Sequence, residues 1–171
     1  MHEGMTDAQQ DPEAVLLIED REPQPVLSIR ATVAIDALTQ AQSQTLSELW
    51  RFMQARGLRP VAPPFVRYHA IGETETDVEV GVPVSEGATG EGGIEGGALP
   101  GGAAIATWHL GEHDSLGKAY GRLDAWLEEN EGEAAGPAWE VYWWIDASQE
   151  PDPSSWPAPT EWRTELVQPI V

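Results

Sequence analysis

The chain contains no cysteine, and its basic residues are few. Without thiols it can form no disulfide, no thiolate nucleophile and none of the commonest structural zinc sites. Only 9 lysines and arginines stand against 29 acidic residues, which gives a formal net charge of -20. A chain this acidic, without a basic cluster, repels phosphate backbones. The composition therefore argues against direct nucleic-acid binding.

Long apolar runs are also missing. Residues 1–13 are polar and contain no apolar core of signal-peptide length, and no later segment approaches the length of a membrane span. We therefore expect a cytoplasmic protein with no membrane partner. A length of 171 residues with 41% hydrophobic content is typical of one globular domain.

Strands and one helix are predicted in the first half of the chain. The strand segments are residues 15–19, 26–33, 65–69 and 78–84. A helix is indicated by the three- and four-residue spacing of Leu46, Leu49, Trp50 and Met53. We expect Asp36 or Thr39 to cap its start, and Gly57 to lie just past its end.

A glycine-rich segment separates this half from the next. Residues 85–97 hold six glycines and three glutamates, which predicts a flexible acidic loop with nothing to bury. After it the same order returns, with a strand at 103–109, a strand from Trp139 and a closing segment at 162–170. The intervening helix is expected to begin at a cap on Asp114 or Ser115 and to have an apolar stripe formed by Leu116, Tyr120, Leu123 and Leu127.

The two halves share local sequence features as well as this order. Residues 63–68 and 137–142 both follow the pattern proline, any residue, aromatic, two residues, tyrosine, and residues 79–84 correspond to 165–170. We predict an α+β fold of two β-α-β-β halves related by a pseudo-two-fold axis. The halves span about 15–84 and 99–171, joined by the flexible loop 85–98, and a disordered tail covers residues 1–14.

One carboxylate lies in the most aromatic stretch of the chain. Residues 139–144 read WEVYWW and are typical of a strand. Because strand side chains alternate, Glu140, Tyr142 and Trp144 share one face, and Trp139 and Trp143 the other. Tryptophan is also the dominant aromatic residue, with eight copies against three tyrosines and two phenylalanines, and its flat face suits both cores and pockets for flat ligands.

The alignment of the halves places Glu140 opposite Val66, which predicts a buried position for the carboxylate. A buried unpaired charge is costly. Two interpretations remain: an ion pair with a core arginine such as Arg67 or Arg30, or a site that stays unpaired until a ligand binds.

The chain resembles the GyrI-like small-molecule-binding proteins, which also occur as effector domains of AraC- and MerR-type transcription regulators. The resemblance spans residues 15–171 and depends on the order and spacing of short segments, namely 26–32, 49–57, 64–68, 78–84, 99–102, 109–111, 119–120, 139–142 and 164–170. It implies an antiparallel curved sheet with two main helices and a central cleft. Because fourteen residues ahead of the first strand are too few for a helix-turn-helix, we expect a stand-alone binder.

The resemblance also implies the site. The cleft is expected to bind flat, hydrophobic, often cationic small molecules, with Glu140 at its floor and no cofactor or metal. The expected ligand-binding residues are Glu140, Tyr142, Trp144, Tyr68, Trp108, His109, Phe65, Trp139, Trp143 and Trp162. One departure is His113, where family members often have tyrosine, so the polar rim of the pocket is expected to differ.

Two other functions stay open. Some stand-alone GyrI-like proteins are hydrolases that open the cyclopropane ring of genotoxic natural products, and in that case Glu140 is the expected general base, aided by Tyr142. The family is named after a gyrase inhibitor, and an acidic surface can imitate DNA, so a protein partner is the third interpretation.

The sequence also contains a possible zinc motif. Residues 109–113 match H-x-x-E-H, an inverted zinc-protease pattern. That pattern needs a helix to bring both histidines to one face, whereas Gly111 and the expected cap place it at a strand-to-helix junction. We therefore expect no metal there. The glycines of residues 90–97 do not form a phosphate-binding loop.

Overall fold

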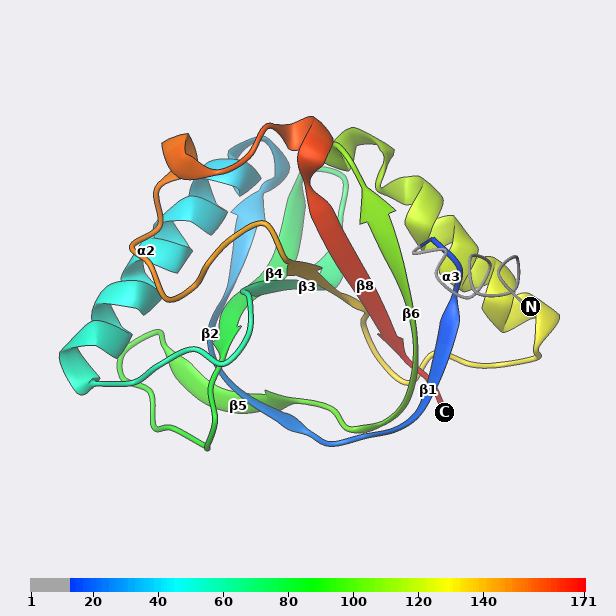
Figure 1. Ribbon diagram of the computed structural model, residues 1–171, viewed down its shortest axis with the longest axis horizontal. Coiled ribbons are helices and arrows are strands. Elements are labelled where there is room, and N and C mark those ends of the chain that lie inside the picture. Colours follow the sequence, from blue (N-terminus) through cyan, green and yellow to red (C-terminus); the bar gives the residue numbers. More distant parts are fainter. Residues whose placement is uncertain (1–12) are drawn as a thin grey trace, which may run out of the picture.

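The computed structural model describes residues 13–171, in which eight strands form one antiparallel sheet with two helices (Figure 1). The strands are β1 (Leu16–Arg21), β2 (Gln24–Ala34), β3 (Phe65–Ile71), β4 (Glu75–Pro83), β5 (Glu95–Leu99), β6 (Gly102–Leu110), β7 (Trp139–Tyr142) and β8 (Arg163–Pro169). The helices are α2 (Leu38–Arg56) and α3 (Gly117–Glu129). Short 3-10 helices are η1 (Ile35–Ala37), η2 (His113–Ser115), η3 (Pro153–Ser155) and η4 (Pro159–Glu161). The expected tail lies almost wholly outside the described residues.

The strand order is symmetric about its centre, which confirms the predicted α+β fold of two similar halves. The sheet runs β1-β6-β8-β7-β3-β4-β2-β5, so β2, β4 and β3 mirror β6, β8 and β7. The first strand of each half crosses to the other half, since β1 pairs with β6 and β5 pairs with β2. At the centre, Val66 of β3 pairs directly with Glu140 of β7. The two residues that the halves equate therefore meet on the pseudo-two-fold axis.

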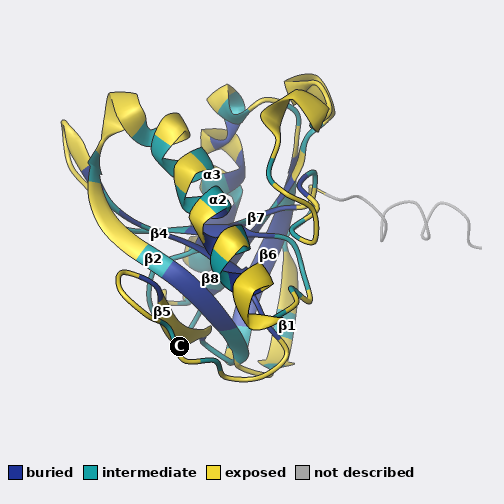
Figure 2. Cartoon of the chain, turned by 90° about the vertical axis from the view of Figure 1, so that its left-hand side faces the viewer, coloured by how far each residue is buried: buried dark blue, intermediate teal, exposed yellow. Residues whose placement is uncertain are grey.

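Both helices pack on the same face of the sheet. Leu46, Leu49 and Met53 of α2 are buried against β2 and β4, and Ala119 and Leu123 of α3 are buried against β6 and β8. Figure 2 shows that the outward faces of the helices are exposed and that the buried residues follow the strands. The opposite face of the sheet has a separate core around Phe65 and Trp139. None of the described helices is long and apolar enough to cross a membrane.

A glycine at position 81 makes that second core possible. A Cβ at Gly81 would lie 2.6 Å from the ring of Phe65 and 2.8 Å from the carbonyl oxygen of Leu27. The ring of Phe65, which is fully buried, therefore packs directly over the backbone of β4.

The predicted caps are wrong for both helices. The residue before α2 is Ala37, the residue before α3 is Leu116, and neither makes a side-chain capping bond. A 3-10 turn precedes each helix, and its backbone bonds satisfy N–H groups that a side chain would otherwise cap. The expected end of α2 is confirmed, because Gly57 adopts the left-handed conformation there with φ 68°.

The prediction of a flexible loop with nothing to bury is wrong for part of residues 85–97. Strand β5 begins at Glu95 and pairs with β2, and Ile94 and Leu99 at its two ends are buried. These two apolar side chains stabilise the segment despite its glycine content.

Candidate ligand-binding site

Glu140 lies at the centre of the sheet and is buried, with 2% of its surface exposed. Its strand neighbours across the sheet are Val66 on β3 and Leu166 on β8. All three side chains lie on the face that carries the helices, so the carboxylate points into the space between α2 and α3. Glu140 is thus buried at the position that the alignment of the halves places opposite Val66.

Two tyrosines hold the carboxylate. The hydroxyl of Tyr120, from α3, donates to Oε2 of Glu140 at 2.6 Å, and the hydroxyl of Tyr142 donates to Oε1 at 2.8 Å. Burial raises the pKa of Glu140 above its ordinary value of 4.5, and the two hydrogen bonds oppose this rise. Burial, reinforced by the negative charge of Glu140, also raises the pKa of both tyrosines, so they remain proton donors.

Of the two interpretations left open for Glu140, the ion pair with a core arginine is not the one that the structure has. Arg30 forms a salt bridge with Asp77 at 2.8 Å, and Arg67 donates to the carbonyl oxygen of Pro137 at 3.2 Å. Arg67 alternates with Val66 along β3 and therefore points to the opposite face. In the described part of the chain, no basic side chain contacts Glu140.

A cavity of about 430 Å³ opens beside the carboxylate. Glu140 contributes to its wall together with two tyrosines and mostly apolar residues, namely Ile35, Leu38, Tyr68, Ile71, Thr76, Tyr120, Ala138 and Gln168. We call it the carboxylate cavity. Its rim is supplied by η1, α2 and the far end of β3.

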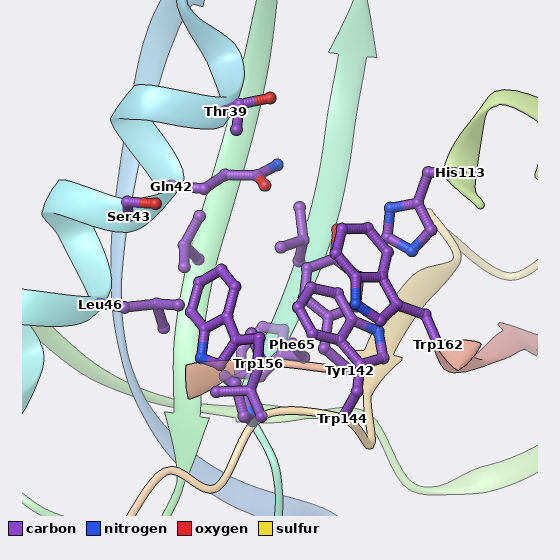
Figure 3. A pocket seen from close by; sticks show the side chains of 14 residues that line it. Thr39, Gln42, Ser43, Leu46, Phe65, His113, Tyr142, Trp144, Trp156 and Trp162 are labelled. Atoms are coloured by element: carbon purple, nitrogen blue, oxygen red, sulfur yellow. The ribbon is translucent and has the colours of Figure 1, made fainter. Parts of the chain in front are cut away.

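A second cavity, of about 170 Å³, lies between α2 and the chain that follows β7 (Figure 3). Aromatic residues form one side and polar residues of α2 the other. Its lining is Thr39, Gln42, Ser43, Leu46, Pro64, Phe65, Val66, Val80, His113, Tyr142, Trp144, Ile145, Trp156 and Trp162. We call it the tryptophan cavity.

The aromatic wall of the tryptophan cavity is a column of three parallel rings. Tyr142 stacks on Trp144 at 5.1 Å between centroids, and Trp144 stacks on Trp162 at 3.9 Å with only 4° between the planes. Trp156 meets Trp144 edge-on at 5.3 Å. The indole N–H of Trp162 donates to the carbonyl oxygen of Pro157 at 3.0 Å, which fixes the last ring of the column.

His113 borders the same column. Its ring lies 5.0 Å from Trp162 and 5.2 Å from Tyr142, and its Nε2 lies 2.8 Å from Oγ1 of Thr164. Burial, together with the nearby His109, lowers the pKa of His113 to about 4. The imidazole is therefore neutral near pH 7. His113, which stands where the family often has tyrosine, thus contributes a neutral, polar ring to the pocket.

The expected site residues divide between the two cavities. Glu140 and Tyr68 line the carboxylate cavity, whereas Tyr142, Trp144 and Trp162 line the tryptophan cavity. Phe65 also borders the tryptophan cavity, although its ring packs in the core on the opposite face.

The other expected residues lie elsewhere. Trp108, Trp139 and Trp143 point to the opposite face of the sheet, where Trp139 is buried beside Arg21 and Trp108 lies 5.7 Å from Trp143. His109 is buried at the end of β6, and its Nε2 lies 2.8 Å from the carbonyl oxygen of Glu112. The structure does not bring these four residues to either cavity.

Several residues of the site were not expected. Tyr120 was assigned only to the apolar stripe of its helix, although it holds Glu140. Thr39, Gln42 and Ser43 face the tryptophan cavity, and their spacing relative to Leu46 is that of one helix face. The sequence does contain a signal for these three residues, because they continue the apolar stripe of α2 with polar side chains on the same helix face.

The histidine motif lies where the sequence places it, at the junction between β6 and η2. His109 contacts the turn around Glu112, and His113 contacts Thr164. Among residues 13–171, no group of three or more histidine, aspartate or glutamate side chains is arranged to hold a metal ion.

Solved structures with the same fold include EcmrR in complex with DNA and its C-terminal domain. EcmrR in complex with DNA is 24% identical with a TM-score of 0.74, over 97% of this chain and 61% of that chain. The EcmrR C-terminal domain is 26% identical with a TM-score of 0.71, over 92% of this chain and 96% of that one. The chain thus spans less than two thirds of the EcmrR chain in the DNA complex. No curated protein sequence matches it significantly.

Two more distant structures share the fold alone. A hydrolase from Listeria innocua is 10% identical with a TM-score of 0.64, over 98% of each chain. SAV2435 bound to tetraphenylphosphonium is 11% identical with a TM-score of 0.56, over 92% of this chain and 93% of that one. The model of the GyrI-like small molecule binding domain matches residues 17–171. The chain therefore belongs to the family of GyrI-like small molecule binding domains.

Proposed function

We propose that this protein binds hydrophobic, often cationic drug-like compounds, flat ones among them, in the carboxylate cavity, with Glu140 as the counter-ion of the cations. One observation supports this function above the others. Glu140 is 2% exposed, its hydrogen-bond partners are two tyrosine hydroxyls, and it borders a cavity of about 430 Å³. A volume of this size is in the range of drug-sized ligand sites.

The physical reason is the cost of burying the carboxylate. Tyrosine hydroxyls stabilise the charged form without neutralising it, and burial still raises the pKa of Glu140. A bound organic cation supplies the missing opposite charge, and at intermediate effective dielectric its attraction is worth up to about 4 kcal/mol. The ring faces of Tyr68 and Tyr120 add cation–π contacts of about 0.5–2 kcal/mol each.

Neither contribution requires one ligand shape, so we propose broad recognition of lipophilic cations for sequestration or sensing. SAV2435, which has the same fold, is described as bound to tetraphenylphosphonium, a cation of this class. The acidic surface of the chain, with a formal net charge of -20, favours the approach of cations.

Titration with tetraphenylphosphonium tests the proposal. Replacing Glu140 by glutamine should weaken binding by about 2 kcal/mol, or roughly 30-fold, because the charge is lost while the shape is kept. Glu165→Gln is the matched control. Glu165 is a half-buried carboxylate whose pKa is also raised by burial, but it lies on the opposite face of the sheet beside Trp143. Equal affinity of wild type and Glu140→Gln would refute the counter-ion role.

A second candidate function is hydrolysis, with Glu140 as general base. The observation that favours it is the pair of tyrosine hydroxyls that position a carboxylate of raised pKa, because a raised pKa makes the carboxylate a stronger base. The expected substrates are the cyclopropane-containing genotoxic compounds that the family resemblance suggests. Loss of the chromophore of such a compound over many turnovers would establish catalysis, and stoichiometric protection without turnover would exclude it.

A further inference from the structure

The carboxylate cavity and the tryptophan cavity have no lining residue in common. Tyr142 lies between them, since its ring belongs to the aromatic column and its hydroxyl donates to Glu140. Beside it, Nε2 of Gln42 donates to the hydroxyl of Tyr68 at 3.3 Å. Gln42 lines the tryptophan cavity and Tyr68 the carboxylate cavity, so this bond joins α2 to β3 along the boundary.

The two cavities differ in charge. None of the fourteen residues that line the tryptophan cavity is aspartate, glutamate, lysine or arginine, and its one histidine is neutral near pH 7. A cation there would lose water without gaining a counter-ion, which is costly. The tryptophan cavity therefore favours an uncharged occupant.

The volume and the lining residues of the tryptophan cavity restrict the type of ligand further. A volume of about 170 Å³ is close to that of an apolar cavity that accepts benzene, about 150 Å³. The column of Tyr142, Trp144 and Trp162 offers aromatic contacts on one side (Figure 3). On the other side, α2 presents the hydroxyls of Thr39 and Ser43. An aromatic ring with a hydroxyl or amide substituent would therefore pack on the column and form hydrogen bonds with these hydroxyls.

We propose that the tryptophan cavity is a second ligand site, which takes one uncharged aromatic ring with a polar substituent and fills independently of the carboxylate cavity. This goes beyond the proposed function, because it does not require Glu140. Compounds of the phenol and benzamide class are the expected occupants.

The test uses two probes on the whole chain, namely 4-hydroxybenzamide, which is uncharged at pH 7, and phenyltrimethylammonium, a compact cation. Binding is followed by NMR of the indole N–H groups of the eight tryptophans. We expect 4-hydroxybenzamide to shift the signals of Trp144, Trp156 and Trp162 saturably. Its dissociation constant should change less than twofold when phenyltrimethylammonium is saturating.

Variants on the two faces of the sheet give the structural control. Trp156→Ala should weaken the binding of 4-hydroxybenzamide at least tenfold, since Trp156 is half-buried, lines the cavity and is not one of the three stacked rings of the column. Trp143→Ala, an equal truncation at an exposed position on the opposite face, should leave the affinity unchanged. Thr39→Val combined with Ser43→Ala should weaken binding several-fold.

Three results would overturn the second site: no saturable shift, competition between the two probes, or wild-type affinity in Trp156→Ala. The outcome is separable from that of the proposed function. If the amide binds and the cation does not, the counter-ion role fails and the second site stands. The converse result rejects only the second site.

Discussion

At the scale of single residues, the protein concentrates its unusual chemistry on Glu140. A carboxylate at the centre of a sheet, between Val66 and Leu166, would normally require a basic partner. Here Tyr120 and Tyr142 donate hydrogen bonds without contributing positive charge. The two hydrogen bonds therefore fix the position of the carboxylate, but they leave its negative charge without a basic partner.

This arrangement has a measurable effect on stability. Burial raises the pKa of Glu140 in the folded state, so the folded protein binds its proton more tightly than the unfolded chain. Stability attributable to this group is therefore full below pH 4.5 and falls as the pH rises towards the folded-state pKa. Glu140→Gln should raise the Tm at pH 8 by about 2–4 °C, roughly 1 kcal/mol for a chain of this size.

The difference between the variant and wild type should shrink as the pH falls towards 4.5, which thermal melts at several pH values would check. A variant that is less stable than wild type at pH 8 would show that the tyrosine bonds outweigh the cost of burial.

A second prediction concerns Gly81, whose missing side chain makes room for Phe65. Gly81→Ala should lower the free energy of unfolding by about 1–3 kcal/mol, because the added Cβ would lie 2.6 Å from the ring. Urea denaturation measures the change. Gly87→Ala is the control, since a Cβ there meets nothing within 4 Å and should alter stability by less than about 0.5 kcal/mol. Equal effects of the two substitutions would contradict the close packing.

At the scale of elements, each half of the chain depends on a strand that the other half supplies. Strand β1 is the first strand of the first half but pairs with β6, and β5 is the first strand of the second half but pairs with β2. Leu99, at the end of β5, is 4% exposed and packs with Val26 and Phe65. The glycine-rich segment is thus part of the fold.

Leu99→Ala should therefore destabilise the protein by about 2–5 kcal/mol, as expected for a truncated core residue. The neighbouring exposed position gives the comparison, because Ala98→Ser should change the free energy of unfolding by less than about 0.5 kcal/mol. Denaturant titration of both variants provides the values. A cost below 1 kcal/mol for Leu99→Ala would mean that β5 contributes little.

Periodicity and repetition in the sequence were sufficient to predict both helices, all strands except β5, and the duplicated order. The side-chain alternation around Glu140 was also predicted correctly, and Trp144 keeps to it although β7 ends at Tyr142. The glycine-rich composition predicted a loop where β5 forms, because it does not show that the buried side chains of Ile94 and Leu99 stabilise this segment. The predicted helix caps were wrong because a 3-10 turn precedes each helix, and such a turn leaves no distinct pattern in the sequence.

The candidate site was only partly predictable. The strand pattern identifies Glu140 and the face of the sheet on which it lies. It does not predict which residues of α2 and α3 contact that face. Tyr120, Gln42 and Ser43 reach the cavities through the packing of α3 and α2 on the sheet. Tyr142 and the hydrogen bond between Gln42 and Tyr68 lie along the boundary of the two cavities, and no local sequence pattern specifies that bond.

At the scale of the whole molecule, charge should govern the approach of ligands. The formal net charge of -20 attracts cations over distances that salt screens, with a Debye length of about 10 Å at 0.1 M. Raising the ionic strength from about 20 to 300 mM should slow the association of tetraphenylphosphonium several-fold and change its dissociation little. Stopped-flow mixing would measure both rates. The uncharged 4-hydroxybenzamide serves as control, and an equal salt effect on both probes would contradict electrostatic steering.

The most direct test of Glu140 as counter-ion is calorimetric titration of tetraphenylphosphonium at a series of pH values between 5 and 8. Because the cation pairs with the ionised carboxylate, wild-type affinity should rise with pH until the raised pKa of Glu140 is passed, with proton release over that interval. Glu140→Gln should bind roughly 30-fold more weakly at pH 8, without that dependence on pH. Identical affinities of the two proteins at every pH would contradict the central role of Glu140.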